Sequence, residues 1–370
     1  MDILVFIANL DGAGAQRTTV NLVNAWADDN HNVNLVIGSK KVEYPSYIKL
    51  IRDNVDVLTL NKSKSIYCLF DLILILYTKK IDIVFSPSPE SSAVLMLAKI
   101  FSFNKCGAVV RESNYRSYNK NLLSIRFFFY KYAYRSADAV VALSNGVKND
   151  LINRFNLCSK NIKVIYNPVD IAFIEKQMSD NTYLIEKLKN NQVVNLIAVG
   201  RLVRQKGFDI LINAMDQLHD SNIHLSIFGE GSERENLESL IVKKNLQSRV
   251  FLEGYTKNPY VNMHYSDIFV LSSRWEGFGH VIVESMACGL PVISFDCNSG
   301  PNEIINNGVN GVLCHEESTS CLVKEILKLS YDVERRNILK SNAYKTIKNY
   351  NKNVISSQYI NLFKRSQYKQ

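Results

Sequence analysis

Residues 274–296 read RWEGFGHVIVESMACGLPVISFD, and this stretch decides the fold. Its spacing predicts a glycine-bearing loop, an apolar helix over residues 279–288 that ends at a glycine, and a buried strand over residues 292–295. Glu276 lies in the loop, and Glu284 lies inside the apolar helix. A helix N-terminus presents unpaired N–H groups and the positive end of its dipole, so it attracts phosphate. The stretch therefore predicts a unit that holds an anion beside a carboxylate.

Strand and helix patterns alternate on both sides of this stretch, which is typical of parallel α/β sheets. Polar, lysine-rich sequence over residues 180–191 predicts a link between two such series. We therefore expect an α/β protein with two doubly wound, Rossmann-like domains. The predicted strands span residues 3–8, 32–37, 81–85, 107–110 and 137–143 in the first series, and 193–199, 224–228, 250–252, 268–271 and 292–295 in the second.

The carboxyl ends of the predicted strands are the expected place for ligands, because doubly wound sheets bind them there. Gly12, Gly200 and Glu276 each follow a predicted strand. We expect these three residues to converge on one cleft between the two domains.

Composition limits the class of protein. The 370 residues are 46% hydrophobic, which suits two cores better than one. The 44 Lys and Arg exceed the 35 Asp and Glu by nine, so the chain either favours anionic partners or is a soluble protein rich in lysine. The seven cysteines form no CxxC pair, which predicts reduced thiols rather than zinc ligands. The chain start lacks the basic region of a signal peptide, and no apolar run reaches the ~18 residues that span a bilayer.

Several motifs together resemble the GT4 type of retaining glycosyltransferase, which uses nucleotide sugars and has the GT-B fold. Glu276 and Glu284 are the two glutamates of a segment similar to that family's EX7E signature. Residues 199–212, VGRLVRQKGFDILI, resemble its diphosphate-binding segment, with Arg201 and Lys206 as the two cations. Further similar segments are DGAGAQR at 11–17 (the N-terminal glycine loop), NPVD at 167–170 (the end of the first domain), and NSGPNEII at 298–305 with NGVNG at 307–311 (the last βα turns).

The resemblance implies a division of roles between two domains that face each other across a cleft. Residues 1–170 would bind the acceptor, with a C-terminal helix over about residues 350–370 packing back on them, and residues 185–349 would bind the nucleotide sugar. The implied reaction moves a sugar from a nucleoside diphosphate, UDP by family habit, to a lipid-linked glycan in bacterial surface polysaccharide synthesis. No cofactor or metal is expected, because two cations would neutralise the diphosphate and the chain has no clear Asp-x-Asp.

The resemblance also assigns roles to single residues on the donor side. Glu284 would bind the ribose hydroxyls, and Glu276 would lie near the donor sugar. A solvated helix residue and a helix-start acid are the structural alternatives for these two glutamates, and the apolar neighbours of Glu284 argue against the first. The catalytic candidates are Glu276, Arg201 and Lys206, and the further donor-binding candidates are Gly14, Gly200, Gly277, Phe278, Gly279, Val283 and Glu284.

The acceptor or sugar side departs from the family pattern. Many GT4 enzymes carry a histidine where this chain has VRESNY at residues 110–115. Ser113 or Glu112 would stand in its place, and Arg111 either contacts the acceptor or is structural. Gly12, in the N-terminal glycine loop, is the fourth candidate on this side.

Two apolar segments bear on membrane contact. Residues 120–135, KNLLSIRFFFYKYAYR, mix aromatics with cations, which suits either a helix at an anionic membrane surface or a core helix. Residues 66–77 are too short to span a bilayer and are predicted to be core. We expect a cytoplasmic protein, peripheral at the inner face of the plasma membrane.

Three other functions compete with sugar transfer. A sugar-nucleotide epimerase of related architecture is disfavoured by the cation pair and the two glutamates. A nicotinamide dehydrogenase would need the GxGxxG fingerprint, which fails because position 17 is arginine. A nucleic-acid-binding protein would account for the charge, but no RRM, KH or helix-turn-helix pattern is present and the basic residues are spread along the chain.

Overall fold

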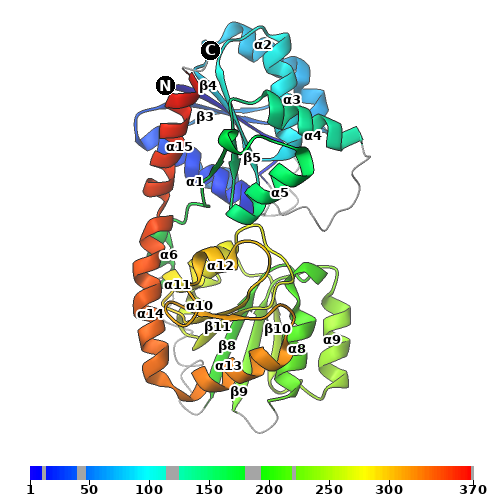
Figure 1. Ribbon diagram of the computed structural model, residues 1–370, viewed down its shortest axis with the longest axis vertical. Coiled ribbons are helices and arrows are strands. Elements are labelled where there is room, and N and C mark those ends of the chain that lie inside the picture. Colours follow the sequence, from blue (N-terminus) through cyan, green and yellow to red (C-terminus); the bar gives the residue numbers. More distant parts are fainter. Residues whose placement is uncertain (11–13, 40–46, 114–124, 180–192, 219–221, 368–370) are drawn as a thin grey trace. The chain divides into compact units, whose positions relative to one another are not determined.

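The computed structural model describes all residues except 11–13, 40–46, 114–124, 180–192, 219–221 and 368–370. The chain forms two compact units, one of Met1–Val169 with Asn351–Gln370 and the other of Asp170–Tyr350 (Figure 1). The polar link predicted over residues 180–191 lies outside the described residues. The helix before it, α6 (Ile171–Ser179), belongs to the second unit.

The first unit is built on a parallel sheet of seven strands among its described residues. The strands are β1 (Asp2–Ile7), β2 (Asn32–Ile37), β3 (Asp56–Thr59), β4 (Ile83–Ser86), β5 (Gly107–Glu112), β6 (Ala139–Ala142) and β7 (Ile162–Val164). They lie in the order β3-β2-β1-β4-β5-β6-β7, so the direction of strand addition reverses between β1 and β4. β3 was not predicted, because it is an edge strand whose Val57 and Leu58 are exposed and it therefore lacks a clear apolar pattern.

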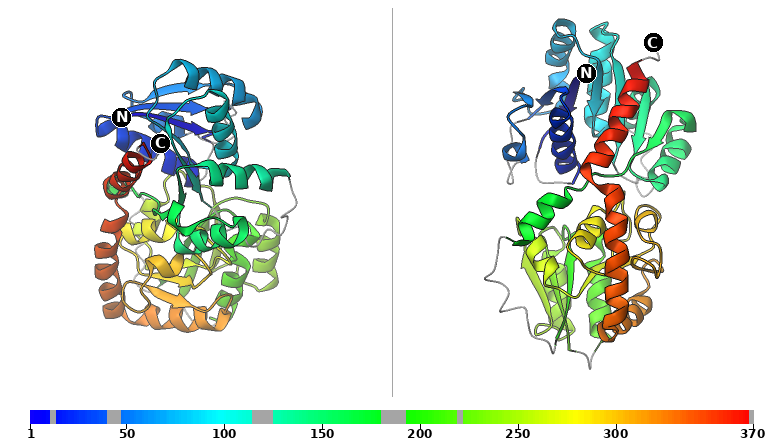
Figure 2. Two further views of the ribbon diagram at one scale, coloured as in Figure 1. Left: turned by 45° about the horizontal axis from the view of Figure 1, so that its top comes forward. Right: turned by 90° about the vertical axis from the view of Figure 1, so that its left-hand side faces the viewer.

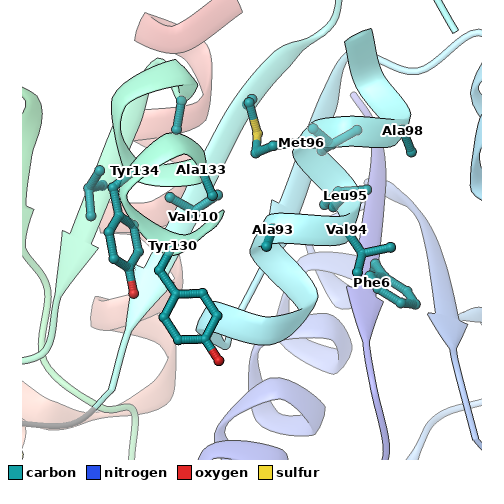
Figure 3. Close-up of a cluster of buried hydrophobic side chains, with 14 of the residues drawn as sticks. Phe6, Ala93, Val94, Leu95, Met96, Ala98, Val110, Tyr130, Ala133 and Tyr134 are labelled. Carbon is teal, nitrogen blue, oxygen red and sulfur yellow. The ribbon is translucent and has the colours of Figure 1, made fainter. Parts of the chain in front are cut away.

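Helices cover both faces of this sheet. On one face Trp26 of α1 packs against Phe363 of α15 with ring centroids 5.1 Å apart, and both helices close over the strands (Figure 2). On the other face Leu95 lies beside Phe6, and Tyr134 belongs to the same buried cluster (Figure 3). The helices are α1 (Gly14–Asp28), α2 (Leu69–Thr78), α3 (Pro89–Phe101), α4 (Ile125–Ser136), α5 (Asn145–Phe155) and α15 (Lys352–Gln367), with 3₁₀ turns η1 (Tyr47–Leu50), η2 (Ser65–Cys68) and η3 (Ser159–Asn161).

Helix α2 differs from its prediction as a core segment. Leu72 and Leu76 are buried in the core, but Phe70 and Tyr77 are 71% and 77% exposed. In the described structure one side of α2 packs against α3 and the core, so a mostly apolar sequence leaves its other side in solvent. Among the described residues, no helix combines the length and the hydropathy that a membrane span requires.

The second unit is built on a parallel sheet of six strands among its described residues. The strands are β8 (Val194–Val199), β9 (Ile223–Phe228), β10 (Val250–Gly254), β11 (Ile268–Leu271), β12 (Val292–Phe295) and β13 (Val312–Cys314), in the order β10-β9-β8-β11-β12-β13. Besides α6, the helices are α8 (Phe208–Asp216), α9 (Arg234–Lys243), α10 (Tyr260–His264), α11 (His280–Ala287), α12 (Pro301–Ile304), α13 (Thr319–Tyr331) and α14 (Val333–Ile347), with η4 (Arg204–Lys206) and η5 (Lys348–Tyr350). The edge strand β13 was not predicted, because three residues are too few for a periodic pattern.

Candidate active site in the second unit

The central strands β8 and β11 are neighbours, and strand addition reverses between them. From β8 the chain adds β9 and β10 on one side, and from β11 it adds β12 and β13 on the other. The loops that follow two such strands separate, which leaves a crevice at the carboxyl edge of a doubly wound sheet. Arg201 and Lys206 follow β8, and Glu276 and Glu284 follow β11, so the predicted donor residues lie on the two loops and helices that flank this switch point.

A buried ion pair joins the two loops. Lys206 Nζ lies 2.6 Å from Glu276 Oε1, and the two side chains are only 16% and 9% exposed. The hydroxyl of Ser273 donates to the same carboxylate oxygen at 2.7 Å. One oxygen of Glu276 therefore receives two donors and is held in a single position.

Backbone contacts keep these two loops in register. The Arg274 N–H donates to the Gln205 carbonyl at 2.8 Å, and the Ser272 hydroxyl donates to the Lys206 carbonyl at 3.0 Å. Gly207, at φ +61°, is the residue at closest approach, since a Cβ there would lie 2.1 Å from the Ser272 carbonyl oxygen. The Lys206–Glu276 pair is thus held by the backbone and does not depend on its own attraction alone.

A second ion pair joins the loop after β11 to the start of α8. The guanidinium of Arg274 binds both carboxylate oxygens of Asp209, at 2.8 and 2.7 Å. Burial by itself raises the pKa of Asp209, but the Arg274 hydrogen bonds and charge outweigh burial, so the net pKa lies below the ordinary value. Arg274 also approaches Glu317 to 3.3 Å, which ties the segment before α13 to this loop.

Glu284 lies on α11 and is 7% exposed. Its Oε1 accepts a hydrogen bond from the Tyr260 hydroxyl at 3.2 Å and lies 3.4 Å from His280 Nε2, one turn earlier on α11. Tyr260 is itself 2% exposed and packs edge-on against Phe173 of α6. Burial with polar partners excludes the alternative that Glu284 is a solvated helix residue.

The glycine loop between Glu276 and α11 has a left-handed backbone at Gly279, which favours glycine. Gly279 is the N-cap of α11 at φ +84°, and the Ser299 hydroxyl donates to the Gly277 carbonyl at 3.0 Å. Phe278 and Val283 are 2% and 0% exposed, so both side chains pack inside the unit. Phe278 and Val283 therefore anchor the loop and α11 in the core of the second unit.

Two other predicted donor residues, Gly200 and Arg201, directly follow β8. Gly200 lies against the aliphatic chain of Lys206, since a Cβ there would be 3.2 Å from Lys206 Cε. Arg201 is exposed, and within the part of the chain that the structure describes its guanidinium makes no hydrogen bond or ion pair. Arg201 is therefore a cation at the edge of the switch point without a counter-charge among the described residues.

The predicted residues of the first unit have a different character. Arg111 is fully buried and donates to the Asn167 side chain, while its Nε and Nη1 have no hydrogen-bond partner among the described residues. Burial lowers the pKa of this guanidinium. Glu112 is 1% exposed and accepts from the Tyr134 hydroxyl at 2.6 Å and from the Ser113 N–H at 2.9 Å.

The glycine-loop candidates of the first unit are only partly described. Gly14 is the first residue of α1, and Gly12 lies outside the described residues. Within the described ranges, no group of three or more His, Cys, Asp or Glu side chains is arranged to hold a metal ion.

Sequence reasoning missed Ser273 and Tyr260. Ser273 lies two residues after β11 and three before Glu276, so its place at the strand's carboxyl end was a usable signal. Tyr260 lies 24 residues from Glu284 on a different helix, and no local pattern connects them.

Two family models match the chain in succession. Residues 12–173 match Glycosyltransferase Family 4, and residues 181–346 match Glycosyl transferases group 1. An uncharacterized glycosyltransferase of Methanocaldococcus jannaschii, MJ1059, is 34% identical over 57% of this chain, a match that spans only 54% of that protein.

A longer match joins the chain to an enzyme of Campylobacter jejuni, the N-acetylgalactosamine-N,N'-diacetylbacillosaminyl-diphospho-undecaprenol 4-alpha-N-acetylgalactosaminyltransferase. It is 27% identical over 94% of this chain and 95% of that enzyme. The crystal structure of HepE from Anabaena in complex with UDP-glucose superposes with a TM-score of 0.84 at 21% identity, covering 99% of this chain and all of that one. With two parallel sheets and two successive family matches, the chain is a glycosyltransferase of the GT-B fold.

Proposed function

We propose that the protein is a retaining glycosyltransferase that moves a hexose or N-acetylhexosamine from a UDP-sugar to a lipid-linked glycan during bacterial surface polysaccharide synthesis. The buried Lys206–Glu276 pair at the switch point is the observation that carries this proposal. It places a cation and a carboxylate together at the edge of the sheet where doubly wound proteins bind nucleotides.

The proposed role of Arg201 and Lys206 is to neutralise the charge of the diphosphate leaving group. Breaking the bond from sugar to diphosphate develops negative charge on the phosphate oxygens, and fixed positive charges stabilise that state. Lys206 is held in place by Glu276, and Arg201 has no protein counter-charge among the described residues. Arg201 would bind phosphate oxygens with its planar fork, and Lys206 would act as a point charge shared between Glu276 and the diphosphate.

The proposed role of the Glu276 and Glu284 carboxylates is to orient the donor. Ser273 and Lys206 both bind Oε1 of Glu276, so Oε2 is the oxygen left to accept a hydroxyl of the donor sugar. Glu284, held by Tyr260, would accept the ribose hydroxyls. Together they would hold the sugar and the nucleoside at fixed positions on either side of the diphosphate, which is the entropic part of catalysis.

The relatives support the choice of substrates. The Campylobacter jejuni enzyme is named for a diphospho-undecaprenol acceptor, and the Anabaena HepE structure contains UDP-glucose. A lipid-linked acceptor would place the protein at the cytoplasmic face of the plasma membrane, as a peripheral protein. We propose that no metal takes part, because Arg201 and Lys206 supply the charge that a metal would otherwise supply.

Calorimetry with UDP, GDP and NAD, each with and without EDTA, tests which nucleotide the donor site binds and whether a metal is needed. We expect UDP to bind, EDTA to leave its affinity unchanged, and Lys206→Met to weaken it. Binding of NAD alone, or of none of the three, would contradict the proposal.

Product analysis tests the reaction. We expect a UDP-sugar to be consumed only when a lipid-linked acceptor is present, with NMR showing the product's anomeric configuration unchanged from the donor's. Interconversion of UDP-sugars without an acceptor would indicate an epimerase instead.

A further inference from the structure

The outward side of α2 carries an apolar stripe. Phe70, Leu74 and Tyr77 are 71%, 49% and 77% exposed and are spaced i, i+4 and i+7, which places them on one side of a helix. Leu72 and Leu76 on the opposite side are buried in the core. α2 is therefore apolar on both sides, although only one of them packs against this unit.

Helix α4 has the same arrangement. Ile125, Phe128 and Tyr132 are 73%, 59% and 37% exposed at spacings of three and four residues, so they too form a stripe. Tyr130 and Tyr134 face inward and are buried (Figure 3). The core interpretation of this sequence therefore holds for one side of α4, and the other side is an exposed aromatic surface.

Helix α3 connects the two stripes. It packs against α2 on one side and against α4 on the other, and all three helices cover the same face of the first sheet. The turn after α3 extends the stripe of α2, because Asn104 Nδ2 donates to the Leu76 carbonyl at 2.5 Å and Phe103 beside it is 88% exposed. We call the outward sides of α2 and α4, with residues 101–105, the α2–α4 face.

The charges around this face are mainly positive. α4 contains Arg126, Lys131 and Arg135 and no acidic residue. Lys80 and Lys105 are exposed beside the stripe of α2. Of the acids on these elements, Asp71 is paired with Lys62 at 3.1 Å, and Glu90 lies 3.9 Å from Arg126.

Exposed aromatics bordered by lysine and arginine are complementary to an anionic lipid surface. Phe and Tyr rings settle at the boundary between headgroups and acyl chains, and each basic residue near the surface adds attraction to anionic lipid. We propose that the α2–α4 face is a membrane-docking surface of the first unit. This inference rests on the proposed lipid-linked acceptor, and it adds which residues meet the lipid.

Vesicle flotation tests the proposal with the full chain. Vesicles of phosphatidylcholine, with and without phosphatidylglycerol, are the probe. We expect binding to the vesicles with phosphatidylglycerol that weakens as salt is raised, because surface charges are screened. Phe70→Ser/Tyr77→Ser and Phe128→Ser/Tyr132→Ser should each reduce the bound fraction by about tenfold, from the loss of inserted aromatic area.

The matched control is Tyr331→Ser/Val333→Ser, which removes two large side chains that are 73% and 56% exposed where α13 ends and α14 begins in the second unit. It should bind vesicles like the parent protein. No vesicle binding by the parent, or equal losses in control and test variants, would overturn the proposal. So would sedimentation showing a dimer that only the test variants dissociate, because the face would then join two copies of the chain.

Calorimetry with UDP separates this inference from the proposed function. The α2–α4 variants should bind UDP like the parent, since none of the altered residues belongs to the donor site. Intact UDP binding without any vesicle binding would remove the docking surface and leave the donor site standing. Vesicle binding without UDP binding would remove the proposed donor site and leave the docking surface standing.

Discussion

Replacing Lys206 by methionine removes the cation of a buried ion pair while keeping a side chain of similar length. In the native protein Lys206 Nζ lies 2.6 Å from Glu276 Oε1, with 16% and 9% of the two side chains exposed. Lys206→Met leaves the Glu276 carboxylate buried with the Ser273 hydroxyl as its remaining donor. Orphaning one charge of a buried pair costs roughly 3–5 kcal/mol, and the residual exposure places this site near the lower end, at about 3 kcal/mol.

A double-mutant cycle isolates the pair. Glu276→Gln removes the orphaned charge, so the double variant should be no less stable than Lys206→Met alone, and the coupling energy should be about 2 kcal/mol. In a thermal scan, a loss of 3 kcal/mol corresponds to a shift of roughly 6–12 °C for a domain of this size. Urea unfolding followed by tryptophan fluorescence measures all four proteins, and Trp275 beside Glu276 reports on the second unit.

The control for this cycle is Lys244, whose Nζ lies 2.7 Å from Asp216 on a more exposed pair of side chains, 31% and 24%. Lys244→Met should cost no more than about 1 kcal/mol, because partly solvated pairs contribute little. If the two single changes at Lys206 and Glu276 add within about 0.5 kcal/mol, the pair does not form in solution and the reasoning fails. Lys206→Met should in addition lower transfer by on the order of a hundredfold, through the lost charge at the leaving group.

Three further predictions concern the donor helix, pH and thiols. Tyr260→Phe removes a hydrogen bond to the Glu284 carboxylate and should weaken UDP binding by about tenfold in calorimetry, with the circular dichroism spectrum unchanged; equal affinity would show that Tyr260 does not position Glu284. The folded-state pKa of Asp209 is depressed, so the pair with Arg274 stabilises the protein above the unfolded pKa of about 3.9 and this contribution disappears as pH falls through the folded value. The difference in melting temperature between parent and Asp209→Asn should therefore shrink from pH 7 to pH 3, and a difference that grows would contradict the pairing. Cys158 is exposed whereas burial raises the pKa of Cys106 to about 11, so iodoacetamide at pH 8 should label Cys158 first in mass spectrometry, and equal labelling of both peptides would be inconsistent with this structure.

The local parts of the fold could be predicted from the sequence. Continuous apolar runs of four to six residues correspond to central strands such as β1 and β11, because strands buried on both faces have no polar alternation. Edge strands such as β3 could not be predicted, because half-exposed residues carry no such signal. The apolar run of α2 predicted burial correctly for one side of the helix and not for the other, since hydropathy alone does not reveal whether one side of a helix or both sides are packed.

For the candidate site too, the residues could be predicted from the sequence, but the contacts between them could not. Glu276, Glu284, Arg201 and Lys206 could be named from their places after strands and in motifs, because local pattern encodes strand ends and helix starts. Which atoms meet could not be predicted. Lys206 and Glu276 are 70 residues apart, and they touch only because β8 and β11 pair side by side and Gly207 lets the two loops approach.

The sequence by itself determined the central strands, their order and the chemical types available at the ends of those strands. Only the tertiary structure decided that Glu276 shares one oxygen between Lys206 and Ser273, and that the aromatics of α2 and α4 face outward. The physical reason is that propensity and hydrophobic period act over a few residues. Contacts between distant residues depend instead on strand order and on which faces find a partner.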